Sequence, residues 1–145
     1  MKTHYKQLIV LSLFVIVGLT GCTDYGKKVN HGHVEVYYKE GISKEDAQKT
    51  ADLFYRMDAN NSGGIKKSLQ LVKDKDSICF RMVVNEKKLA SVPDDAFNAL
   101  ANILSDSVFN SNPVNVDLTD DHFKTIRSLH YKKMDFNAMP GDSAQ

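Results

Sequence analysis

The sequence has little cysteine, little proline and no excess of charge of either sign. It contains 2 cysteines, 3 prolines and no tryptophan in 145 residues. Two thiols are too few for the disulfide framework of a small secreted scaffold, or for a zinc site built from several thiolates. With 19 basic and 18 acidic residues the formal charge is +1. Electrostatics therefore give no reason to expect nucleic acid as a partner.

A long hydrophobic run is also missing. The most apolar stretch, Leu8–Val17, covers ten residues, whereas a membrane-spanning helix needs about 20. Two lysines precede this stretch, and Gly18 and Gly21 follow it. A positive start, a short apolar core and small residues near the cut are the parts of a signal peptide. We therefore expect residues 1–21 to be a signal peptide.

The residues that end this segment carry a more specific pattern. Leu19-Thr20-Gly21-Cys22 follows the apolar run directly and resembles the lipobox of bacterial lipoproteins. The resemblance implies that the Cys22 sulfur takes a diacylglycerol group, that the chain is cut before Cys22, and that the new amino terminus is acylated, for example with palmitate. Two or three acyl chains, at ~0.8 kcal/mol per buried CH₂, hold a protein firmly at a lipid bilayer.

The resemblance also implies a location. In Gram-negative bacteria, lipoproteins with a residue other than Asp after the lipidated cysteine tend to reach the outer membrane, and Thr23 fits that pattern. We therefore expect a lipid-anchored protein of the cell envelope, at the outer membrane and facing the periplasm in a Gram-negative host.

The remaining chain predicts one small domain between two polar segments. Residues 22–32 are expected to be the lipidated N-terminus and a tether, residues 33–131 a single α+β domain, and residues 132–145 a flexible tail. Segments such as Phe80-Arg81-Met82-Val83-Val84 resemble small domains of uncharacterised envelope lipoproteins. That resemblance implies no activity.

Hydrophobic periodicity predicts four strands and two helices. The strands are expected at 34–38, around Leu69 and Leu71, at 78–84 and at 114–118. Helices are expected from Ser43, which forms a capping box with Asp46, and from about Ser91. The spacing of Phe123, Ile126 and Leu129 favours a helical turn, with an edge strand at 125–127 as the alternative.

The order β-α-β-β-α-β predicts a ferredoxin-like (split β-α-β) sandwich, in which two helices cover one face of a four-stranded antiparallel sheet. Right-handed crossovers give the strands, numbered along the chain, the spatial order 4-1-3-2. An extra edge element near the C-terminus is compatible with this arrangement.

The face of this sheet opposite the helices carries the candidate binding residues. These are Glu35 and Tyr37 on the first strand, Arg81 on the third and Asp117 on the fourth. In the predicted order, Glu35 and Arg81 can pair across neighbouring strands. RNA-binding domains of this topology stack bases on aromatic residues of their central strands. The third strand offers Cys79 and Arg81 instead, so the face is expected to be a solvated surface, a protein–protein surface or a self-association surface.

Three other groups in the sequence are candidates for a catalytic or ion-binding site. Cys79 has no histidine predicted beside it and is expected to be a passive thiol. The Asp58–Ser62 segment opens like an EF-hand loop, but its twelfth position is Leu69 instead of a bidentate glutamate. His31 and His33, or His33 combined with Asp121 and His122, supply few of the ligands that zinc needs.

The sequence thus favours a membrane-anchored envelope lipoprotein with a non-catalytic binding domain, which uses no cofactor, no metal and no catalytic set. The partners expected are the bilayer, through acylated Cys22, and an envelope protein or a second copy of the chain. Two alternatives stay open. One is an envelope hydrolase, metal-dependent or not, with its site near Asp121 and His122. The other is a small-ligand or ion-binding lipoprotein that uses the Asp58–Ser62 loop or the glycine-rich turn as its site.

Overall fold

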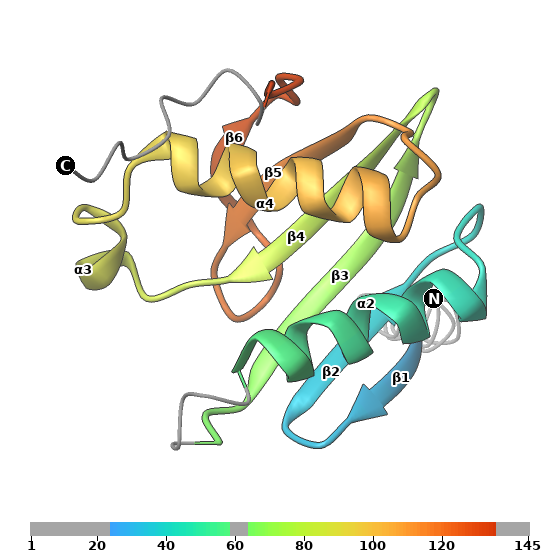
Figure 1. Ribbon diagram of the computed structural model, residues 1–145. Coiled ribbons are helices and arrows are strands. Elements are labelled where there is room, and N and C mark those ends of the chain that lie inside the picture. The colour runs from blue at the N-terminus through green and yellow to red at the C-terminus, as the bar shows by residue number, and fades with distance from the viewer. Residues whose placement is uncertain (1–23, 59–63, 136–145) are drawn as a thin grey trace, which may run out of the picture.

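The computed structural model describes residues 24–58 and 64–135, which form a single six-stranded mixed sheet with three helices (Figure 1). The spatial order of the strands, β1-β2-β3-β4-β5-β6, is also their order along the chain. The elements are β1 (Lys27–His31), β2 (Val34–Tyr38), α2 (Lys44–Asp58), β3 (Lys67–Asp74), β4 (Ser77–Val83), α3 (Glu86–Leu89), α4 (Asp94–Ser107), β5 (Val114–Thr119) and β6 (Thr125–Leu129).

The expectation of a ferredoxin-like, four-stranded antiparallel sheet is wrong. Two strand pairs are parallel, β2 with β3 and β4 with β5, and each pair is joined through one of the long helices. The other three pairs are antiparallel hairpins. A split β-α-β unit has another strand between its two parallel strands, whereas here the parallel strands of each unit are direct neighbours. A connecting helix can join parallel strands in both arrangements, so the order of elements along the chain does not distinguish the two topologies.

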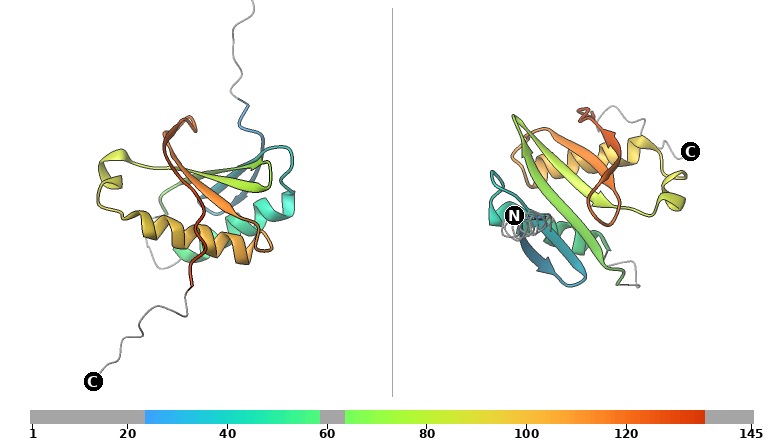
Figure 2. Two further views of the ribbon diagram at one scale, coloured as in Figure 1. Left: turned by 90° about the horizontal axis from the view of Figure 1, so that it is seen from above. Right: turned by 180° about the vertical axis from the view of Figure 1, so that it is seen from behind.

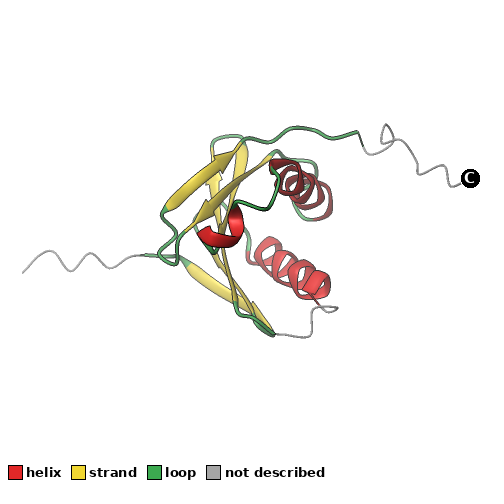
Figure 3. Cartoon of the chain, turned by 90° about the vertical axis from the view of Figure 1, so that its left-hand side faces the viewer, coloured by secondary structure: helices red, strands yellow, loops and turns green. Residues whose placement is uncertain are grey.

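The handedness of the crossovers explains why the topological rule failed. Helices α2 and α4 lie on the same face of the sheet (Figure 3). Both β-α-β units advance in the same direction across the sheet, but their strands run in opposite directions because β3 and β4 are antiparallel. The two crossovers therefore have opposite hands, and one of them departs from the right-handed rule that leads to the order 4-1-3-2.

The core lies between the sheet and the two long helices. The strands contribute alternating apolar residues, and α2 and α4 contribute their apolar stripes, so the predicted faces of these elements are confirmed. Phe80 is fully buried at the centre, where its ring stacks on Phe54 of α2 at 5.3 Å between centroids. The Ser43 hydroxyl accepts the Asp46 N–H at 3.0 Å, which confirms the capping interaction that begins α2.

The ends of the domain depart from the tether and the tail expected from the sequence. β1 lies within residues 22–32, and its one buried residue, Val29, is 6% exposed. At the other end, Lys132 and Met134 bond to Asn98 and Asn102 of α4, which ties the first residues after β6 to the helix layer.

Residues 125–129 form a strand, so the helical turn favoured there is wrong and the edge strand is confirmed.

The chain enters the domain on the face opposite the helices, and the right-hand view of Figure 2 looks onto this open face. Gly26 turns the chain into β1 with φ of +90°. A Cβ at this position would lie 2.4 Å from the Tyr38 carbonyl oxygen, so only glycine fits the turn. No helix within the described ranges is long and apolar enough to cross a membrane.

Candidate functional site

A row of open-face residues crosses all six strands in register. Each member is paired, strand to strand, with the next: Lys28 with Tyr37, Tyr37 with Gln70, Gln70 with Arg81, Arg81 with Asp117, and Asp117 with Ser128. We call these six residues the polar row. Core-facing neighbours alternate with its members on every strand, which fixes this register, because a one-residue slip would exchange the two faces.

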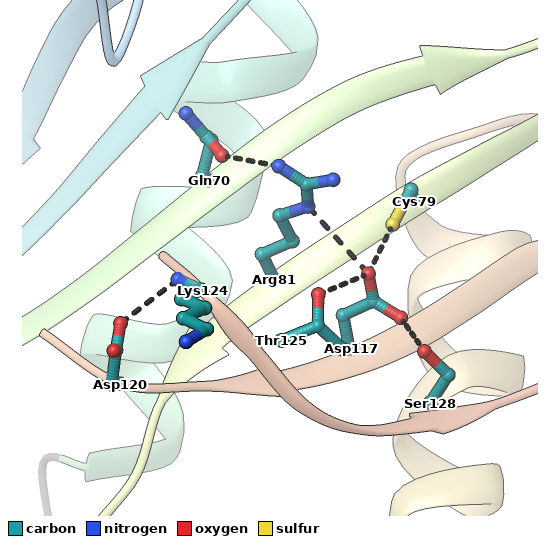
Figure 4. A network of polar contacts seen from close by, with 8 residues as sticks. All are labelled: Gln70, Cys79, Arg81, Asp117, Asp120, Lys124, Thr125 and Ser128. Carbon is teal, nitrogen blue, oxygen red and sulfur yellow. Dashed lines mark hydrogen bonds and ion pairs between the residues drawn. The ribbon is translucent and has the colours of Figure 1, made fainter. Parts of the chain in front are cut away.

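Asp117 is the most heavily bonded member of the polar row (Figure 4). Its carboxylate accepts hydrogen bonds from Ser128 at 2.6 Å, Thr125 at 3.2 Å and the Cys79 thiol at 3.2 Å. The Arg81 Nε lies 3.6 Å from Asp117 Oδ2, at ion-pair distance. The Arg81 Nη1 donates to Gln70 Oε1 at 3.2 Å. The Asp117 side chain is only 13% exposed, so the carboxylate is anchored by its neighbours rather than by solvent.

This network forms the floor of a cleft of about 380 Å³ between β3 and β6. The cleft carries charged and polar groups of both signs, and the buried Arg81 Nε has no hydrogen-bond partner in the described structure. Such a surface, polar and already ordered, can hold a polar ligand group without first being rearranged. The lining residues are Val72, Lys73, Asp74, Cys79, Arg81, Asn115, Asp117, Ser128, Leu129 and His130.

The thiol in this cleft is not a nucleophile at neutral pH. Burial, together with the charge and the hydrogen bond of Asp117, raises the pKa of Cys79 to about 11, although Arg81 acts in the opposite direction. A reactive cysteine needs a lowered pKa, because the thiolate is the attacking species. His130 lines the same cleft, which sequence reasoning missed, but the Cys79 thiol bonds to Asp117. Covalent catalysis by Cys79 would need its thiolate, which this environment disfavours.

Glu35 forms a second polar group next to the row. Its carboxylate accepts from Ser68 at 2.8 Å and pairs with Lys66 at 3.0 Å and Lys28 at 3.4 Å. Burial opposes ionisation of this carboxyl. The bonds from Lys66 and Ser68 and the charges of Lys66 and Lys28 outweigh that effect, and hold the pKa of Glu35 below its ordinary value of 4.5.

This lowered pKa makes a prediction for stability. A carboxyl whose pKa is lower in the folded state stabilises the fold above its unfolded pKa, and the contribution disappears as the pH falls through the folded-state pKa. We expect Glu35→Gln to lower the free energy of unfolding by about 2 kcal/mol at pH 7, and by progressively less between pH 5 and pH 3. Urea denaturation across this range measures the difference. Glu45→Gln, which alters an exposed carboxylate on α2, serves as the control and should show a much smaller loss.

Three aromatic rings cover one end of the open face. Tyr25 precedes β1, Tyr37 lies on β2, and Phe123 lies in the turn between β5 and β6. Their centroids are 5.4 to 5.7 Å apart, in edge-to-face geometry. The Gln70 side-chain amide also donates to the Tyr25 carbonyl at 2.9 Å. The first described residues are therefore attached to the polar row.

The two histidines expected in the tether instead fasten β1 and β2 to α2. His31 lies 2.6 Å from Asp52, and His33 lies 2.7 Å from Asp58. Tyr55 stacks on His31 at 4.0 Å between centroids. Asp52, Tyr55 and Asp58 recur every three residues on one side of α2, a spacing from which the pairing could have been anticipated. These contacts join elements of the fold.

The other ion-site candidates lie in the β5–β6 turn and in the loop that follows α2. The ligand atoms of Asp120, Asp121 and His122 come within 4.8 Å of one another, but Asp120 already accepts the backbone N–H groups of His122 and Lys124, as in an Asx turn. His33 is separated from this turn by β3 and β4, so the composite of His33 with Asp121 and His122 does not form. Residues 59–62 of the Asp58–Ser62 loop lie outside the described residues, as does Cys22.

The predicted binding residues are brought to one face, but not in the pairs expected. Tyr37, Arg81 and Asp117 belong to the polar row, and Glu35 lies beside it. The expected pairing of Glu35 with Arg81 is wrong, because β3 separates their strands. Sequence reasoning missed Ser128 and Tyr25, because β6 was only the alternative to a helical turn and residues 22–32 were expected to form a tether.

Comparison with known proteins places the chain in a family. Residues 28–130 match the family described as the AF_1994_N family N-terminal domain, and the chain belongs to that family. The match begins at the β1 member of the polar row and ends one residue after β6, so it includes every strand. No curated protein and no solved structure matches the chain.

Proposed function

We propose that this chain is a lipid-anchored protein of the bacterial cell envelope whose single domain is a non-catalytic binding module. The cleft on the open face carries the binding part of this proposal. Its central groups, Arg81 and Asp117, are ordered by neighbouring side chains, and the Arg81 Nε has no hydrogen-bond partner among residues 24–58 and 64–135. An ordered polar surface of this kind loses little conformational freedom when it binds.

The lipobox resemblance supports the location. Cys22 would carry the lipid, and Thr23 after it favours the outer membrane, facing the periplasm, in a Gram-negative host. The body of the domain would then lie in the aqueous phase next to the bilayer. An envelope protein or a second copy of the chain is the partner that the sequence favours for such a domain.

The chemistry of the cleft supports binding rather than catalysis. A thiol with a pKa of about 11 is protonated at neutral pH. The hydrolase candidates Asp121 and His122 lie outside the cleft, in the β5–β6 turn. Their side chains are 81% and 71% exposed. Hydrolytic sites depend on groups held in a shielded environment that tunes their pKa values.

Crosslinking in living cells tests the binding proposal. A photoreactive amino acid would replace Ser128, whose side chain lies at the rim of the cleft, and, as a matched control, Ile103 on the helix face. We expect an adduct from position 128 that Arg81→Ala removes, and no such adduct from position 103. An adduct of twice the chain mass would identify self-association. Equal adducts from both positions, or an adduct indifferent to Arg81→Ala, would contradict the proposal.

A further inference from the structure

We propose that the open sheet face lies against the lipid headgroups of the bilayer that anchors the chain, with α2 and α4 turned away from it. The inference rests on the lipid anchor proposed above, and adds to it the orientation of the domain and the surface that the open face meets. That surface is the phospholipid headgroup layer, so a protein partner that occupies the cleft would also have to lie at the membrane surface.

The chain between the proposed anchor and the fold is very short. Only Thr23 separates Cys22 from Asp24, the first described residue. Two residues of fully extended chain span about 7 Å. The point where the chain enters the domain is therefore held within about 7 Å of the acylated residue. A body attached so closely cannot turn freely relative to the membrane.

The point where the chain enters the domain lies on the open face. Tyr25 packs on Tyr37 and Phe123, and its carbonyl accepts the Gln70 amide at 2.9 Å. Tyr37 and Gln70 both point to the open side, because their sequence neighbours point into the core. The chain thus enters from the face opposite the helices, as Figure 3 shows. Contacts on both the ring and the backbone of Tyr25 fix the direction of entry.

The open face exposes two lysines, while two of its carboxylates are shielded. Lys28 and Lys66 extend into solvent, with side chains 42% and 70% exposed, whereas the carboxylates of Glu35 and Asp117 are 11% and 13% exposed. The exposed lysines suit the phosphates of lipid headgroups. Asp24 at the entry point, Asp74 on β3 and Asp121 on the β5–β6 turn are exposed groups of the opposite sign. The short tether is therefore the principal cause of the orientation.

Tryptophan fluorescence tests the orientation directly, because the natural chain has no tryptophan. Single tryptophans would be placed on the open face by Tyr37→Trp and Asn30→Trp, and on the helix face by Ile103→Trp. Each mature lipidated protein, which begins at Cys22, would be reconstituted in phosphatidylcholine vesicles that contain a lipid with a nitroxide on its headgroup. We expect quenching at both open-face positions to be at least twice that at position 103.

A longer tether provides the control. Ten glycine and serine residues inserted between Thr23 and Asp24 would add a flexible segment with an end-to-end distance on the order of 17 Å. We expect this insertion to reduce the contrast between the two faces by at least half. Equal quenching of the two faces with the natural tether, or a contrast unchanged by the insertion, would overturn the inference.

The mass of the reconstituted protein separates the two possible failures. A protein that carries no lipid on Cys22 contradicts the anchor, and with it the proposed location. A lipidated, vesicle-bound protein whose two faces are quenched equally contradicts only the orientation.

Discussion

In bacteria supplied with a palmitate analogue, we expect the wild-type protein to become labelled and the Cys22→Ala variant to remain unlabelled. The modification forms a thioether on the Cys22 sulfur, which alanine lacks, so the loss should be complete. The variant should also keep residues 1–21, because in bacterial lipoproteins cleavage follows lipidation. Gel fluorescence and the mass of the intact protein measure both effects.

Cys79→Ala is the matched control for this experiment, since it removes the only other cysteine. It should be labelled and processed like the wild type, because the Cys79 thiol is half-buried and bonded to Asp117. A labelled Cys22→Ala protein, or a mature wild-type protein that starts at residue 1, would contradict the lipid anchor.

Asp117→Asn should cause the second large effect, a loss of about 3 kcal/mol in the free energy of unfolding. Removing one partner of a poorly solvated ion pair leaves the other charge uncompensated, and this typically costs 3–5 kcal/mol. Here the orphaned charge is that of Arg81, which would keep only its bond to Gln70. A loss near the lower limit is expected because Arg81 is 29% exposed. Urea denaturation at neutral pH measures the change.

An exposed aspartate tests whether this loss is specific to the network. Asp121→Asn alters a carboxylate that is 81% exposed and bonded only to the adjacent His122. Its effect should remain within about 0.5 kcal/mol, as for most surface substitutions. Similar losses in the two variants would show that Asp117 has no special role in holding the sheet face together.

The same Asp117→Asn variant should change the acidity of Cys79. The charge of Asp117 and its hydrogen bond both raise the pKa of this thiol, in addition to burial. Without the charge, we expect the pKa to fall below about 11. Burial, the larger cause, remains and should keep it above its ordinary value of 9.0. Thiolate absorbance followed against pH gives the value, since Cys79 is the only free thiol once Cys22 is lipidated.

Much of the local structure was predictable because it depends on neighbours in the chain. Alternation predicted β2, β4 and β5, and the capping pattern of Ser43 and Asp46 predicted the beginning of α2. The polar face of β2, with Glu35 and Tyr37, follows from the same alternation. β1 was missed because Lys27–His31 has only one inward apolar residue, Val29, and an edge strand can form mainly through backbone bonds to its partner.

By itself, the sequence determined the apolar faces of the strands and helices, and which side chains of β2, β4 and β5 share the open face. These depend on periodicity, which is local. The short distance from Cys22 to the fold emerged only when the structure placed β1 in the sheet. Only the tertiary structure decided which strands are neighbours, and so that Arg81 meets Asp117 instead of Glu35. Strand order depends on which faces pack together across distant segments, and the opposite hands of the two crossovers leave no trace in the order of elements along the chain.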